Sequence, residues 1–244
     1  MRILLVNPNT TASMTAKIGA AAKAAAAPGV EIRAVNPDFG PPSIEGYYDE
    51  AFAVPGLLAE MAKAPDADAV VVACFDDTGL DAARAATHAP VVGIGEAAFH
   101  LASLLAPKFS VVTTLARSIA PIEHNLVKYG LAARCARVRA AEVPVLALED
   151  ESSDARRRIE TEIVRALAED GAEAIVLGCA GMTDLARDLE RKAGAPVLDG
   201  VASATVLAEG LVRLGLKTSK RNTYAAPLAK TYQGAFAGFS PRSP

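Results

Sequence analysis

The sequence predicts an α/β fold in which two similar α/β domains with mainly parallel sheets are related by pseudo-twofold symmetry, with the functional site in the cleft between them. Apolar runs of strand length alternate with helix-like stretches, which favours a parallel sheet over an antiparallel one. The strand runs are continuously apolar, as is typical of strands covered on both faces. In addition, the second half of the chain repeats features of the first.

The first predicted elements are a strand, a helix and a second strand. Arg2–Val6 ends in the turn Asn7-Pro8-Asn9, and Thr10 or Thr11 is placed to cap the helix that follows. That Ala-rich helix runs over Ala12–Ala27, Pro28-Gly29 ends it, and Val30–Val35 forms the next strand. Residues 36–56 are rich in proline and glycine, so a long loop is predicted there.

The later strands are short apolar runs separated by stretches long enough for helices. They are expected at Ala69–Ala73, Pro90–Ile94, Phe109–Thr113, Ala174–Leu177 and Pro196–Leu198. No structure or function is predicted for the tail from about Gly234, which ends in FSPRSP.

The repeat places one cysteine in each half. VVVACFDDTGL is followed by a helix and APVVGIGEA, and AIVLGCAGMTDL is followed by a helix and APVLDGVASA. Cys74 precedes Pro90 by 16 residues, and Cys179 precedes Pro196 by 17. Ligands of parallel sheets bind beyond the carboxyl ends of the strands, so we expect both cysteines to face one cleft. A repeat this faint is also compatible with coincidence.

Composition excludes several classes of function. The 244 residues carry a formal net charge of −3 and no Lys/Arg-rich run, which excludes a nucleic-acid surface. Apolar runs are far shorter than the roughly 18–20 residues that span a membrane, and the start lacks the features of a signal peptide. A cytoplasmic protein is therefore expected. The histidines (His88, His100, His124) show no metal-ligand spacing, so no metal is predicted.

Two of the three cysteines have the context of reactive groups. Cys74 and Cys179 each follow a buried strand and precede a helix start, with Asp76, Asp77 or Thr78 as caps in the first case and Thr183 in the second. The helix dipole lowers a thiol pKa, whereas apolar surroundings raise it. The alternative is that free cysteines act as small buried hydrophobes. Cys135 lacks such a context and is interpreted as structural.

Two further segments carry polar groups whose role stays open. The NPNTT turn brings amides and hydroxyls to a strand end, where they either bind a ligand or only shape the turn. The SIEGYY segment brings Glu45 beside apolar and aromatic side chains, either as a flap over a ligand or as a surface loop.

Taken together, the chain resembles the aspartate/glutamate racemase superfamily, and specifically its hydantoin racemase branch. The stretches that carry the resemblance are LLVNPNTTASMT, GPPSIEGYYDE, VVACFDDTGLDAAR, PVVGIGEAA, VLGCAGMTDL, PVLDGVASA and LVRLGLKTSK. The resemblance implies a first domain of residues 1–97 plus 205–244 and a second domain of residues 98–204. It also implies that Cys74 and Cys179 are the two catalytic groups, and that the enzyme is a homo-oligomer.

The resemblance implies a racemase that works without metal or cofactor on a small cyclic ureide. One cysteine, as a thiolate, removes the C5 proton of a 5-monosubstituted hydantoin, and the other returns a proton on the opposite face. Free cysteine is only about 3% thiolate at neutral pH, so the site must favour one charged thiol. The backbone N–H groups of Phe75, Asp76, Ala180 and Gly181 are candidates to hold the enolate oxygen and ring carbonyls.

The residues beside the cysteines indicate the substrate branch. Racemases of acidic amino acids usually place Asn-Thr after the first cysteine, whereas this chain has Phe75-Asp76. An apolar wall favours a bulky hydantoin substituent over allantoin. Allantoin racemase, a related lyase or isomerase, an amino-acid racemase and a non-catalytic binding protein remain alternatives. The resemblance implies that the ring touches Asn9, Ser43, Ile44, Cys74, Phe75, Thr113, Thr114, Cys179 and Met182.

Overall fold

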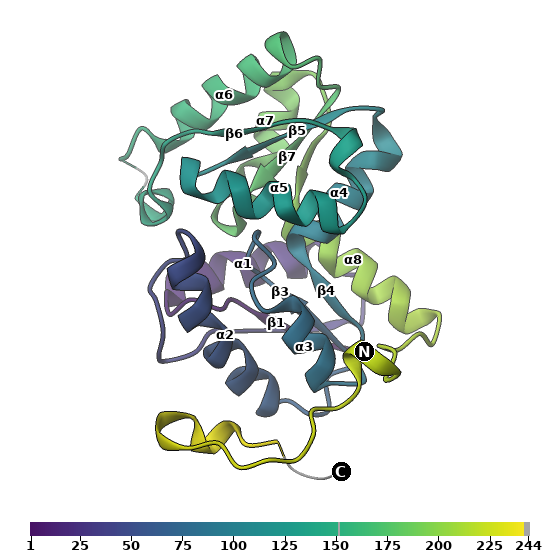
Figure 1. Ribbon diagram of the computed structural model, residues 1–244. Helices are drawn as coiled ribbons and strands as arrows, with labels where there is room; N and C mark the ends of the chain where they lie inside the picture. The colour runs from purple at the N-terminus through teal and green to yellow at the C-terminus, as the bar shows by residue number, and fades with distance from the viewer. Residues whose placement is uncertain (151, 242–244) are drawn as a thin grey trace.

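The computed structural model describes residues 1–150 and 152–241, which form two α/β halves (Figure 1). Each half contains a four-stranded parallel sheet. The first sheet has the order β2-β1-β3-β4 and the second β6-β5-β7-β8. Adding four to each strand number of the first sheet reproduces the second, so the predicted α/β repeat is confirmed. The strands are β1 (Arg2–Val6), β2 (Glu31–Val35), β3 (Ala69–Val72), β4 (Val91–Gly93), β5 (Phe109–Thr113), β6 (Cys135–Ala140), β7 (Ala174–Gly178) and β8 (Val197–Asp199).

Helices cover the sheets, as continuously apolar strands require. All four residues of β3 and all five residues of β5 and β7 are buried. The helices are α1 (Ala12–Ala25), α2 (Tyr47–Ala62), α3 (Leu80–Ala86), α4 (Ile94–Leu105), α5 (Ile119–Lys128), α6 (Ala155–Glu169), α7 (Ala186–Ala193) and α8 (Gly200–Arg213).

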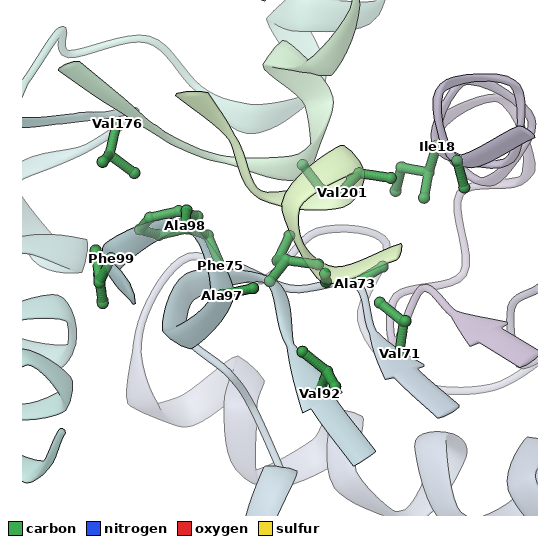
Figure 2. Close-up of a cluster of buried hydrophobic side chains, with 14 of the residues drawn as sticks. Ile18, Val71, Ala73, Phe75, Val92, Ala97, Ala98, Phe99, Val176 and Val201 are labelled. Atoms are coloured by element: carbon green, nitrogen blue, oxygen red, sulfur yellow. The ribbon is translucent and has the colours of Figure 1, made fainter. Parts of the chain in front are cut away.

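Helices α4 and α8 pack together between the two sheets and join the halves into one core. They follow the corresponding strands β4 and β8. Their starts approach closely: a Cβ on Gly200 would lie 2.6 Å from the carbonyl oxygen of Ile94, so only glycine fits there. The largest buried cluster includes side chains from both sheets and both helices (Figure 2), among them Val71, Val92, Val176, Phe99 and Val201.

The structure differs from the sequence-based expectation between residues 36 and 56. The loop ends at Gly46, and α2 continues through Pro55 and Gly56. Gly56 permits this because a Cβ there would meet the ring of Pro37 at 2.7 Å, where α2 crosses the loop. Pro55 and Gly56, which favoured a loop in the sequence, therefore lie within α2, and Gly56 allows that helix to pack closely against Pro37.

Three other local expectations also need correction. Helix α1 ends at Ala25, and although Thr11 occupies its N-cap position, the Thr11 hydroxyl donates to the carbonyl of Pro42 instead of capping the helix. Strand β6 was not expected, and it contains Cys135. Gly234–Phe239 forms a short 3₁₀ helix in the tail for which no structure was predicted; its last residues, 242–244, lie outside the described residues.

The segment after α8 contacts the first half. The backbone N–H and hydroxyl of Thr218 donate to the carbonyls of His88 and Ala89, and the Tyr224 hydroxyl donates to Asp81. These contacts support the domain division that we propose, with residues 1–97 and 205–244 in one domain and 98–204 in the other. No helix in the described part of the chain has the length and apolar character to cross a membrane.

Candidate active site

A small cavity lies at the carboxyl ends of the central strands of both sheets. Its lining follows β1 and β3 in the first half and β5 and β7 in the second. Cys74 lies just past β3 and Cys179 just past β7, so the strand repeat brings one cysteine from each half to the same cavity. The cavity is lined by Asn7, Asn9, Met14, Ile44, Ala73, Cys74, Phe75, Asp76, Thr114, Ser118, Val145, Gly178, Cys179 and Ala180.

A larger cavity, of about 520 Å³, lies elsewhere, between the carboxyl end of α2 and the loop before β4. Its walls are mainly apolar, and its titratable groups are Asp68, His88 and Lys217. Without a thiol or convergent polar groups it offers no catalytic chemistry, so size does not decide which cavity is the site.

The surroundings of Cys74 disfavour its charged form. Its Sγ lies 3.3 Å from the Thr78 hydroxyl. Burial first, and then the Asp76 charge, raise the pKa of the Cys74 thiol well above its ordinary value, while the Thr78 hydroxyl and the backbone N–H of Asp76 lower it. The balance favours the thiol over the thiolate.

Cys179 has a matching environment in the other half. Burial raises its pKa to about 12, against the backbone N–H of Gly181, which lowers it. The charge of Asp76 raises this pKa too, whereas the charge of Lys17 lowers it. Each cysteine thus receives a backbone N–H from the residue two positions later, and Asp76 acts on both.

Two adjacent aspartates follow Cys74 and differ in their partners. The Asp77 carboxylate accepts the N–H groups of Gly95 and Glu96 at 3.0 and 2.8 Å and the Tyr129 hydroxyl at 2.7 Å. Asp77 therefore caps α4, whereas the helix that it was expected to cap, α3, begins after Gly79 without a side-chain cap. Burial raises the pKa of Asp77 to about 7, and its three donors oppose that shift.

The second half has a corresponding cap at the start of α8. Thr183 does not cap the helix that follows it; its hydroxyl donates to Asp199 at 2.6 Å. Asp199 in turn accepts the N–H groups of Val201 and Ala202. Carboxylates thus cap both helices between the sheets, where the dipole favours a negative charge.

Polar contacts hold the first-half loops around the cavity. The Asn7 amide donates to Asn9 at 2.9 Å and to the Thr15 hydroxyl at 3.0 Å, which orients both asparagines at the end of β1. From the second half, the Asn125 amide donates to the Asp76 carbonyl at 2.7 Å. The polar lining is therefore positioned before any ligand binds.

The SIEGYY segment closes over the cavity. Ile44 lines it and is buried. The Glu45 carboxylate accepts the backbone N–H of Val145 at 2.8 Å, which ties this loop to the second half. The segment therefore lies at the cavity and connects the two halves.

The cavity includes most of the residues that the sequence singled out. Asn9, Ile44, Cys74, Phe75, Asp76, Thr114, Cys179 and Ala180 line it. Ser43, Thr113, Gly181 and Met182 do not; the Thr113 hydroxyl donates to the Gly178 carbonyl at 2.9 Å, and Met182 is buried in the core of the second half.

Sequence reasoning missed part of the lining, namely Asn7, Met14, Ala73, Ser118, Val145 and Gly178. Asn7 belongs to the NPNTT turn, so that turn pointed to it, but nothing local marks Ser118 or Val145. Within the described residues, no group of three His, Cys, Asp or Glu side chains is arranged to hold a metal ion.

Known proteins resemble this chain over nearly its whole length. The sequence profile of a family described as Asp/Glu/Hydantoin racemase matches residues 3–208. A hydantoin racemase of Rhizobium meliloti is 49% identical over 96% of this chain and 98% of its own, and one of Pseudomonas sp. (strain NS671) is 46% identical over 98% and 97%. The solved structure of an allantoin racemase from Klebsiella pneumoniae has a TM-score of 0.96 at 48% identity, and the match covers 99% of this chain and 100% of that one.

Proposed function

The chain belongs to the Asp/Glu/Hydantoin racemase family and is an isomerase of the racemase type, and we propose that it interconverts the D and L enantiomers of 5-monosubstituted hydantoins. The main support for this proposal is that Cys74 from one half and Cys179 from the other line the same cavity. Racemisation needs a base on one face of a carbon and an acid on the other, and two opposed thiols supply both.

The proposed reaction uses one thiolate and one thiol. The thiolate takes the proton from C5, and the electron pair of the C–H bond moves onto the neighbouring carbonyl to form an enolate. The second thiol then gives its proton to the opposite face of C5, and the electron pair returns to carbon. The two cysteines have exchanged roles at the end, so the same site serves both enantiomers. No metal or organic cofactor takes part in this proposal.

The raised pKa values of both thiols run against the expectation that the site favours a charged thiol, so the thiolate in the proposed reaction is a minor species. A thiolate that forms in a buried site is a stronger base than one in water, and the C5 proton is only weakly acidic. The backbone N–H groups of Asp76 and Gly181 are the donors that partly stabilise each thiolate. We propose that the N–H groups of Phe75, Asp76, Ala180 and Gly181 also hold the ring oxygens.

The apolar part of the lining favours a substrate with an apolar substituent. Met14, Ile44, Phe75 and Val145 are all buried around the cavity. The second candidate is allantoin, which carries a polar substituent on the same ring, and the likeness to the Klebsiella pneumoniae enzyme supports it. Asn7, Asn9, Thr114 and Ser118 are the lining side chains that could bind a polar substituent.

The test is proton exchange with single enantiomers of 5-benzylhydantoin, 5-isobutylhydantoin and allantoin. In D₂O, loss of optical rotation should accompany loss of the C5 proton signal in NMR spectra. Exchange of allantoin alone would replace the hydantoin proposal with the second candidate. Absence of exchange with all three would refute both.

The cysteine variants test the mechanism. Cys74→Ser and Cys179→Ser should each lower the rate of racemisation by at least about 10²–10⁴-fold, the usual contribution of a general acid or base. Their circular dichroism and thermal unfolding should match those of the unmodified protein. Racemisation at a near-normal rate by either variant would exclude the two-thiol mechanism.

We also propose that the enzyme is a homo-oligomer. Leu228, Tyr232 and Phe236 lie exposed within nine residues of the C-terminal segment, and exposed apolar surface is typical of an interface. Light scattering after gel filtration should give a multiple of the 25.2 kDa chain mass, and a monomer at micromolar concentration would contradict the proposal.

A further inference from the structure

Asp76 is a buried acid in the cavity that has no partner for its carboxyl group. It lines the cavity and is only 9% exposed. Its backbone carbonyl accepts the Asn125 amide, but no side-chain or backbone group among the described residues donates to its carboxylate. The neighbouring Asp77, equally buried, has three donors. Buried polar groups are normally paired, so the Asp76 carboxyl is available to a ligand.

Glu50 provides a second buried oxygen without a partner near Asp76. It lies in the first turn of α2, and its Oε1 is buried without a hydrogen-bond partner among the described residues. Burial raises the pKa of Glu50, and the Glu50 charge acts on both Asp76 and Cys74.

The groups that face Asp76 are therefore all acidic. They are Glu50 from α2, Asp77 from the same loop and the two thiols from the ends of β3 and β7. The nearest cation that acts on the site is Lys17, which is paired with Glu149 at 3.0 Å. Burial first, and then the charges of Glu50 and Asp77, raise the pKa of Asp76 to about 8, so the carboxyl is mainly protonated at pH 7.

We propose that the protonated Asp76 carboxyl donates a hydrogen bond to the ring carbonyl next to C5, where negative charge develops, and that Glu50 is a positioning residue that keeps Asp76 protonated. This inference rests on the racemase activity proposed above. A neutral acid can serve as a donor to an enolate oxygen in a water-poor site, where such a bond is strong. A hydroxyl or amide side chain would also donate a hydrogen bond to the enolate oxygen, but that donation would not depend on pH.

The Asp76 proton stays on Asp76 through the cycle. One thiolate takes the C5 proton while the electron pair moves to the carbonyl oxygen that Asp76 contacts. The other thiol then protonates C5, the pair returns to carbon, and the hydrogen bond weakens. If Asp76 were ionised, its charge would oppose both the enolate and the thiolate. The same acids would repel a substrate carboxylate, so an uncharged ring is the class of ligand that fits.

Three variants test the donor role: Asp76→Ala, Asp76→Asn and Glu50→Gln, with the exposed Asp38→Asn as a control. Asp76→Ala should lower kcat about 10²–10³-fold, the usual cost of one enolate or oxyanion donor. Asp76→Asn keeps an N–H donor of similar shape, so its kcat should fall less than about tenfold. KM should change little in both, because the bond strengthens mainly in the transition state.

The pH profile distinguishes this role from a merely structural one. The activity of the unmodified enzyme should rise with pH as the thiolate forms and level off above about 8, where Asp76 ionises. In Asp76→Asn the rise should continue to higher pH. In Glu50→Gln the levelling should move to lower pH, because a negative charge that raises the Asp76 pKa has been removed. Asp38→Asn should leave the profile unchanged.

Two kinetic outcomes and one spectroscopic outcome would overturn the proposal. Equal losses of kcat in Asp76→Asn and Asp76→Ala would show that an N–H donor at this position does not replace the carboxyl group, which contradicts the donor role. Near-normal kcat in Asp76→Ala would show that Asp76 does not contact the reacting oxygen. Infrared difference spectra between the unmodified protein and Asp76→Asn at pH 7 report the protonated carboxyl without any substrate. Absence of that band would refute the proposal even if racemisation occurs, whereas absence of C5 exchange would refute the racemase activity instead.

Discussion

The loop after Cys74 contains two adjacent buried aspartates, and we expect their replacement to change the stability of the protein in opposite directions. Asp77→Ala removes the acceptor for the N–H groups of Gly95 and Glu96 and for the Tyr129 hydroxyl. Loss of an N-cap costs about 1–2 kcal/mol, and a buried hydroxyl left unpaired adds about 1–3 kcal/mol. We expect a loss of about 3 kcal/mol, because contacts that share one carboxylate are not additive.

Thermal unfolding followed by circular dichroism measures this loss. For a chain of this length, about 3 kcal/mol corresponds to a Tm lower by roughly 6–12 °C. Tyr129→Phe removes one of the three donors and should cost about 1 kcal/mol. A Tm change below about 2 °C for Asp77→Ala would refute the conclusion that Asp77 holds the start of α4.

The Asp76→Asn variant is the comparison for Asp77→Ala, and its effect on stability depends on pH. The pKa of Asp76 is about 8 in the folded protein against an ordinary value of 3.8. Between these values the unfolded chain ionises while the folded chain keeps its proton, so the stability of the unmodified protein falls as pH rises. We therefore expect the Asp76→Asn variant to be more stable than the unmodified protein, by a margin that grows from about pH 4 to about pH 8. A constant difference over that range would contradict the raised pKa.

Four other substitutions probe separate parts of the structure. Cys135→Ala should leave the rate of racemisation unchanged in the assay used for the other cysteines, because Cys135 lies in β6, away from the cavity lining; a large loss would overturn that reading. Glu45→Ala should raise KM severalfold with little change in kcat, as measured by steady-state kinetics, because the flap loses its bond to the second half; an unchanged KM would count against closure. Gly95→Ala should lower the Tm markedly because a Cβ would meet the Phe75 carbonyl at 2.4 Å, whereas Gly210→Ala, in open space within α8, should raise stability by about 0.5–1 kcal/mol.

Much of the fold follows from local sequence pattern. Phe109–Thr113 and Arg2–Val6 form strands within the expected bounds, and the other predicted strands differ from the observed ones by one or two residues at their ends. A short, continuously apolar run is typical of a buried strand, so the bounds of such strands follow from the local sequence. The exception is β6, whose alternating charged residues hid it, although its Arg139 is buried and paired with Asp170.

The sequence by itself indicated that two cysteines end two equivalent strands and face one cleft, and the resemblance to a racemase family added that both are catalytic. Only the tertiary structure decided which side chains complete the cavity. Val145 and Ser118 reach it from the second half, and Asp77 caps a helix that begins seventeen residues later rather than the one beside it. Strand ends are local features of the chain, but burial and the supply of donors depend on segments that meet only after folding. For that reason two adjacent aspartates that look alike in the sequence have different partners.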